Sequence, residues 1–222
     1  MPSISTPEQA IARANQLTRL ERNFGAPAAT LTAVTNDVTP YLGEENARKH
    51  AWQVVYPPGR LALSGSRGAG PDAYVRTFKV VLDTASGNLL FLTSTYQGPP
   101  DPNMLPMPSC DAATVQLVNE EEVYNGYPSQ DPRIDFIAAL ESIQNEGIGS
   151  PLQAKEIHAV YVLHSRMGLD PSPAWAITLR GLPPFAAHGP NPKSIPVSVR
   201  NFMRNVVDAF SGHVLFATNS PQ

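Results

Sequence analysis

The chain has 222 residues, of which 42% are hydrophobic and 16% charged, and its formal net charge is −3. This composition excludes an intrinsically disordered protein, and the charge excludes attraction to nucleic acid or an anionic membrane through a bulk basic field. A single cysteine excludes an intramolecular disulfide, and no apolar run approaches the roughly 20 residues of a membrane-spanning helix.

The first predicted element is an amphipathic helix at residues 7–24. Thr6 is a suitable N-cap, Pro7 suits the first helical position, and Gln9 completes a capping box. Apolar residues then recur at helical spacing, and Gly25 predicts the end of the helix as its C′ residue.

Alternating apolar residues predict antiparallel strands after this helix. A weak candidate covers residues 30–35, and a stronger strand contains Trp52, whose side chain we expect in the core between sheet and helix. A hairpin follows, with its turn at residues 83–87. Asp83 is placed to accept hydrogen bonds from the turn backbone, and Gly87 supplies a positive φ.

The second part of the chain repeats these elements. Residues 208–218 resemble residues 83–93, about 125 positions earlier, and Trp175 recurs with Trp52. Asp131-Pro132 predicts the start of a second helix that ends at Gly147. Further strands are predicted at 157–163, around Trp175, at 202–208 and at 213–218.

The repeat predicts an α+β protein of two tandem units, each with one helix packed on a three- to four-stranded antiparallel sheet. The units cover residues 1–96 and 131–222, and a proline-rich connector, residues 97–130, joins them. Glu120-Glu121-Glu122 in this connector is interpreted as a solvated run, with a cation or a basic partner as the alternative.

Two long loops are the candidate binding regions. A double proline follows each tryptophan strand and precedes a loop, residues 59–74 in the first copy and 185–197 in the second. Loops of this length in a compact domain are often functional, so we expect them to meet a partner at one end of the molecule. The candidate partner-binding residues are Arg60, Arg67, Tyr74, Phe185, His188 and Lys193.

Motifs that would carry chemistry are weak. Residues 64–70 resemble a phosphate loop but lack its Gly-Lys-Ser/Thr ending, and Cys110 has no rigid scaffold to hold a base. His158 and His164 are interpreted as solvent-facing strand residues, since no zinc-binding spacing occurs. We therefore expect no catalytic residue, no cofactor and no metal site.

The two hairpins, within residues 80–93 and 205–218, each contain hydrophobic positions around an Asp-x-x-x-Gly turn after a helix and an aromatic strand. This arrangement resembles the PepSY domain and the wider cystatin-like folds. The resemblance implies a module that restrains peptidases or belongs to the bacterial cell envelope.

We therefore expect a non-enzymatic binding or inhibitory module whose partner is another protein, such as a peptidase or an envelope component. One alternative is a small-molecule-binding or enzymatic protein with a pocket between helix and sheet; another is a structural or assembly protein. No nucleic acid and no membrane span are expected. No leader is visible, so we expect a cytoplasmic protein if Met1 is the native start, and an envelope or secreted one if a leader was removed.

Overall fold

The computed structural model describes residues 3–33, 50–63, 75–98, 122–124, 126–147, 150–166, 170–182 and 202–219. Its α-helices are α1 (Pro7–Thr18) and α3 (Phe136–Asn145), and short 3₁₀ turns lie at η1 (Leu20–Arg22) and η4 (Pro151–Gln153). Its strands are β1 (Ala28–Ala33), β2 (His50–Arg60), β3 (Val75–Asp83), β4 (Leu89–Tyr96), β5 (Glu122–Tyr124), β6 (Glu156–Arg166), β7 (Ser172–Arg180), β8 (Phe202–Asp208) and β9 (Val214–Asn219).

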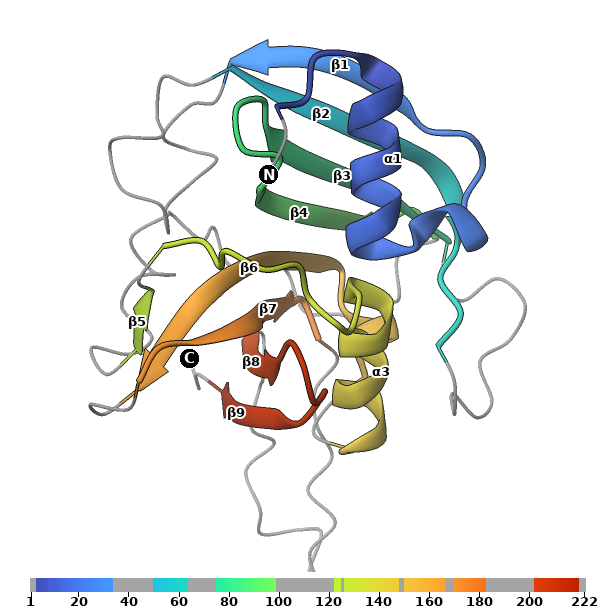
Figure 1. Cartoon of the computed structure of the whole chain (residues 1–222). Coiled ribbons are helices and arrows are strands. Elements are labelled where there is room, and N and C mark those ends of the chain that lie inside the picture. The colour runs from blue at the N-terminus through green and yellow to red at the C-terminus, as the bar shows by residue number, and fades with distance from the viewer. Residues whose placement is uncertain are drawn as a thin grey trace, which may run out of the picture.

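The described strands form one antiparallel sheet in the order β1-β2-β3-β4-β6-β7-β8-β9, and β5 pairs with β6 outside this path (Figure 1). The prediction of two separate helix-on-sheet units is therefore wrong. The reason lies at β4 and β6, where Leu92 pairs with Ala159 and Thr95 with Glu156. Two strands that would each have been an exposed edge pair with one another, which joins the sheet of the first copy to that of the second.

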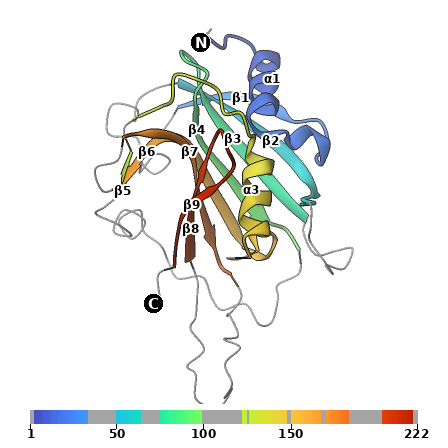
Figure 2. The ribbon, with the colours of Figure 1, turned by 60° about the horizontal axis from the view of Figure 1, so that its bottom comes forward.

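Both α-helices lie on the same side of this sheet (Figure 2). They share one hydrophobic core rather than covering two. A chain of aromatic contacts crosses the junction: the ring of Phe78 on β3 lies 5.0 Å from Phe24 and 5.9 Å from Phe136 on α3. Phe136 in turn lies 5.9 Å from Trp175. The fold is thus dominated by one sheet, and its two copies depend on a common interior.

The helix boundaries differ from the prediction at two of four ends, and the end of the second helix at Gly147 (φ 69°) is confirmed. The N-terminus of α1 is confirmed, with the Thr6 and Gln9 capping box formed as expected. The helix ends earlier, at Thr18, because Arg19 adopts the left-handed conformation (φ 55°) that was assigned to Gly25. The second helix starts at Phe136 with Asp135 as its N-cap, so Asp131 is left free for another role.

The double proline of the first copy does not end the tryptophan strand, as predicted, but lies within it. Pro57 and Pro58 belong to β2, whose register against β3 shifts between Tyr56 and Gly59. Proline has no backbone N–H to give to a ladder, so an irregular step in the pairing accommodates it. Among the described residues, no helix is long and apolar enough to cross a membrane.

Candidate functional site

The two aspartate turns are closed by the same set of hydrogen bonds. The Asp83 carboxylate accepts hydrogen bonds from the Ala85 and Ser86 amides and from the Ser86 hydroxyl. Asp208 receives the same three kinds of bond from Phe210 and Ser211. Gly87 and Gly212 both have positive φ, 68° and 79°. The predicted capping role of both aspartates is therefore confirmed.

The tryptophans anchor the chain that leads into each helix. Trp52 Nε1 donates to the carbonyl of Ile4 at 3.0 Å, and Trp175 Nε1 donates to the carbonyl of Ile134 at the same distance. Both rings are buried in the common core, as predicted. The features shared by the two copies are thus occupied in holding the fold, and a functional site is better sought where the copies differ.

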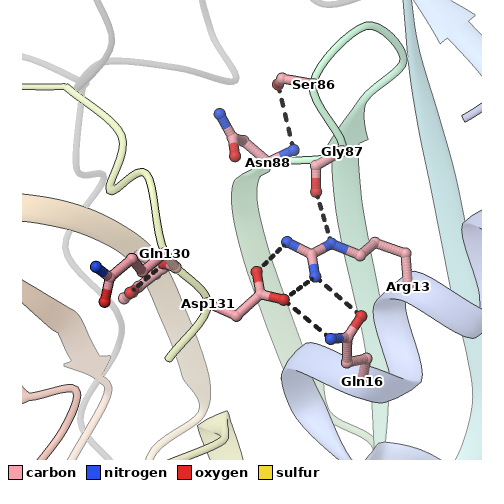
Figure 3. Close-up of polar contacts among 8 residues, drawn as sticks. Arg13, Gln16, Ser86, Gly87, Asn88, Gln130 and Asp131 are labelled. Carbon is pink, nitrogen blue, oxygen red and sulfur yellow. Dashed lines mark hydrogen bonds and ion pairs between the residues drawn. The ribbon is translucent and has the colours of Figure 1, made fainter. Parts of the chain in front are cut away.

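A polar clamp joins the two copies on the helix side (Figure 3). Arg13 of α1 donates to both carboxylate oxygens of Asp131, at 2.6 and 2.8 Å, and to the carbonyl of Gly87 at 3.0 Å. Gln16 donates to the same carboxylate at 2.9 Å. A second ion pair, 2.9 Å long, links Arg19 to Asp135 at the N-terminus of α3. The clamp therefore ties α1 and the Asp83 turn of the first copy to the second copy.

The clamp lines a surface hollow of about 440 Å³ between α1 and the Asp83 turn. Its polar lining includes Arg13, Gln16, Ser86 and Asp131. The hydrogen bonds from Arg13, with one from Gln16, hold the pKa of Asp131 below its ordinary value, so this carboxylate is ionised at neutral pH. Since the polar groups of the hollow already bind one another, the arrangement serves as a structural joint.

A buried arginine forms a further link across the junction. Arg76 on β3 is fully buried and donates to the carbonyls of Leu152, at 3.1 Å, and of Ala154, at the end of η4. Burial lowers the pKa of its guanidinium to about 10, which still leaves it charged at neutral pH. Arg76 alternates along β3 with Phe78 and Val80, so it lies on the helix-covered face of the sheet.

Asn205 is a second unpredicted polar group on the helix-covered face. It lies opposite Ile177 in the β7–β8 register and is fully buried. Within the described part of the chain, neither its amide nitrogen nor its amide oxygen has a hydrogen-bond partner. Val80 holds the corresponding position of the first copy, three residues before Asp83. An unsatisfied buried amide is costly, so Asn205 marks a real difference between the copies.

The opposite face of the sheet carries a small group of ionisable side chains. His158 Nε2 lies 3.3 Å from a Glu156 carboxylate oxygen, and Arg180 lies 3.9 Å from the same oxygen. The hydrogen bond with His158 holds the pKa of Glu156 below its ordinary value. His164, predicted to face solvent, is instead buried near the end of β6. No group of three or more potential metal ligands occurs among the residues that the structure describes.

Each end of the described sheet is formed by a strand with a neighbour on one side. Of the described strands, β1 and β9 each pair on one side only, and Figure 1 shows them at opposite ends of the sheet. Neither strand contains a charged residue. Each carries an exposed leucine: Leu31 on β1 is 57% exposed and Leu215 on β9 is 49% exposed. Natural edge strands usually carry charges or prolines that discourage pairing, and these two do not.

One of the six predicted loop residues, Arg60, lies in the described part of the chain. Arg60 is the last residue of β2, where it pairs with Val75 of β3. Arg67, Tyr74, Phe185, His188 and Lys193 lie outside the described residues, as do Cys110 and the loop at 64–70. The outer edges of β1 and β9 were not predicted as sites, although the uncharged run Ala28–Ala33 is visible in the sequence.

Comparison with known proteins gives no relative: no family model, no curated protein and no solved structure matches the chain.

Proposed function

We propose that this protein is a non-enzymatic binding module that takes an extended segment of a partner protein along the outer edge of β1, which no described strand covers. In this mode the partner adds a strand to the sheet, and main-chain hydrogen bonds supply the affinity. The observation that carries the proposal is the chemistry of β1, an uncharged edge strand with Leu31 largely exposed.

The rest of the fold suits this role. The β2 strand beneath β1 is long and is held by α1 and the core, so the edge is presented on a rigid support. Val55, opposite Ala28 in the β1–β2 register, adds a second exposed apolar side chain next to the edge. The PepSY-like resemblance favours a peptidase or a cell-envelope component as the partner, which stays a prediction.

Asn205 favours a second candidate, a small-molecule pocket between helix and sheet. Such a pocket needs a polar group that faces the helices, and Asn205 does so with both amide atoms unbonded among the described residues. The hollow described above lies elsewhere, between α1 and the Asp83 turn, and Asn205 is not among its lining residues. We therefore prefer strand addition at β1.

A displayed library of short unstructured peptides tests the proposal. We expect selected peptides to slow hydrogen exchange at the outward-facing amides of Ala28–Ala33, because those amides become bonded to the peptide. Leu31→Lys should weaken binding by about tenfold or more, since it places a charge on the edge. Leu215→Lys is the matched control, with the same substitution at an equally exposed leucine on the other edge. Peptides that bind both variants equally, or that protect a different segment, would contradict the proposal.

A further inference from the structure

The junction between β4 and β6 is a template for pairing between molecules. In the repeat, β9 corresponds to β4, because the hairpin of residues 83–93 matches that of residues 208–218. In the same way β1 corresponds to β6, since each pairs with the tryptophan strand of its own copy. Inside the chain, the strands of these two kinds meet and pair antiparallel. At the two ends of the sheet, β1 and β9 each have one described neighbouring strand.

We infer that the partner at the β1 edge is a second copy of this chain, which docks head to tail so that its β9 pairs antiparallel with β1. This inference rests on the proposed function and names the partner of the same edge. The contact is heterologous, because the two molecules use different surfaces, and each docked copy leaves one β1 and one β9 edge open. Such a contact builds a chain of molecules unless it closes into a ring.

The internal register can be transferred to the two edges residue by residue. Leu92 pairs with Ala159 in the junction. Leu92 corresponds to Ala217, and Ala159 corresponds to Ala29, since Ala159 lies opposite Ile177 and Ala29 opposite Val54. The transferred register therefore places Ala217 opposite Ala29.

Two steps further along the same register, the bulge residue Leu215 falls at the level of Leu31. The two leucines lie on opposite faces of the sheet, because Leu31 pairs with Trp52 on the helix-covered face and Leu90, the equivalent of Leu215, packs in a separate cluster on the other face. The docked pair would therefore bring one exposed leucine to each face of the new junction. The bulge next to Leu215 has its counterpart in the first copy, where β3 and β4 shift register beside Leu90. There the equivalent leucine is buried among Ala51, Val81, Phe91 and Tyr127.

The clamp shows why this contact should be weaker than its template. Arg13 lies against Gly87 in the first copy, and Ser142 lies against Gly212 in the second. A serine side chain is short and uncharged, so it cannot form the ion pair that Arg13 forms with Asp131. The intermolecular junction therefore keeps the strand pairing and loses this ion pair, so we expect association that is reversible and depends on concentration.

Cysteine cross-linking of the full chain tests both the contact and its register. The background carries Cys110→Ser, and Ala29→Cys and Ala217→Cys are introduced in separate chains. Mixed under mild oxidation, the two chains should form a disulfide-linked dimer that neither forms alone. The matched control uses Ala33→Cys in place of Ala29→Cys, mixed with the same Ala217→Cys chain. Residue 33 lies about 13 Å further along β1, so this pair should not form a disulfide-linked dimer. Sedimentation of the unmodified chain should show larger species as concentration rises.

Each outcome of these experiments supports or overturns the head-to-tail contact. Dimers of Ala29→Cys alone or of Ala217→Cys alone would show that like edges pair, which overturns the head-to-tail contact. Equal cross-linking of Ala33→Cys, or a chain that stays monomeric and does not cross-link, overturns it too. If cross-linking fails while displayed peptides still protect β1, strand addition stands and only the second copy is wrong. If β1 takes neither the peptides nor a second copy, both proposals fall.

Discussion

The two copies of the repeat keep the same internal devices and differ where they meet their neighbours. Both have a tryptophan bonded to the chain before the helix and an aspartate turn closed by a glycine. They differ at the leucine beside the β-bulge of each hairpin: Leu90 of the first copy is 1% exposed, and Leu215 of the second is 49% exposed. Residues that the two copies share therefore indicate the fold. Residues that differ between the copies indicate which surfaces the rest of the chain covers.

Truncation of the two bulge leucines should separate the copies most strongly. Leu90→Ala removes a buried side chain and is expected to lower the free energy of unfolding by about 3 kcal/mol. Leu215→Ala removes an exposed one and should cost less than about 0.5 kcal/mol in dilute protein. Urea unfolding at low protein concentration measures both. Equal losses would mean that Leu215 is covered in the isolated chain, and the comparison between the copies would fail.

A reciprocal exchange at the core position tests the second difference. Asn205→Val gives the second copy the residue of the first and should stabilise the protein by about 1–2 kcal/mol, because it removes an unsatisfied buried amide. Val80→Asn, the reverse change, should destabilise it by a similar amount or more. Thermal unfolding of the two variants measures the pair. A loss of stability in Asn205→Val would show that the amide has a partner, such as a bound ligand, that stabilises the protein.

The clamp predicts a smaller effect that depends on pH. Hydrogen bonds from Arg13 keep the folded pKa of Asp131 below its ordinary value of 3.8. The ionised carboxylate therefore stabilises the fold above that pH, and the contribution is lost as pH falls through the lowered folded pKa. Because Asp131 is 37% exposed, Asp131→Asn should cost only about 0.5–1 kcal/mol at pH 7.

Urea unfolding of this variant and of the unmodified chain from pH 7 to pH 2 should give curves that converge in acid. Glu21→Gln, an exposed substitution that removes the same charge, is the control and should run parallel to the unmodified chain. A difference between Asp131→Asn and the unmodified chain that stays constant down to pH 2 would show that the clamp does not act through the ionised carboxylate.

The sequence predicted local structure well where a residue acts on its own neighbours. The Thr6 cap, the aspartate turns and the tryptophan strands all depend on contacts within a few residues or on alternation along one strand, so their patterns are visible in the chain. The end of α1 was missed because Arg19, not a glycine, took the left-handed position.

The union of the two sheets could not be predicted in the same way. It depends on whether the outer edge of β4 faces solvent or pairs with β6. The sequence of an apolar strand is the same in both cases, so it does not distinguish them. The clamp was equally hidden, since Arg13 and Asp131 are 118 residues apart and no motif links them. Asp131 even carried a competing local explanation as a helix cap, which Asp135 in fact supplies.

The buried Arg76 has a consequence for how the protein is made. Its guanidinium needs the carbonyls of η4 and Ala154, which follow it by 75 to 78 residues. A nascent chain that has emerged only as far as β4 would have to bury this cation without those partners, at a cost of several kcal/mol. We therefore expect the first copy to wait, incompletely closed and exposed to chaperones, until Ala154 has left the ribosome.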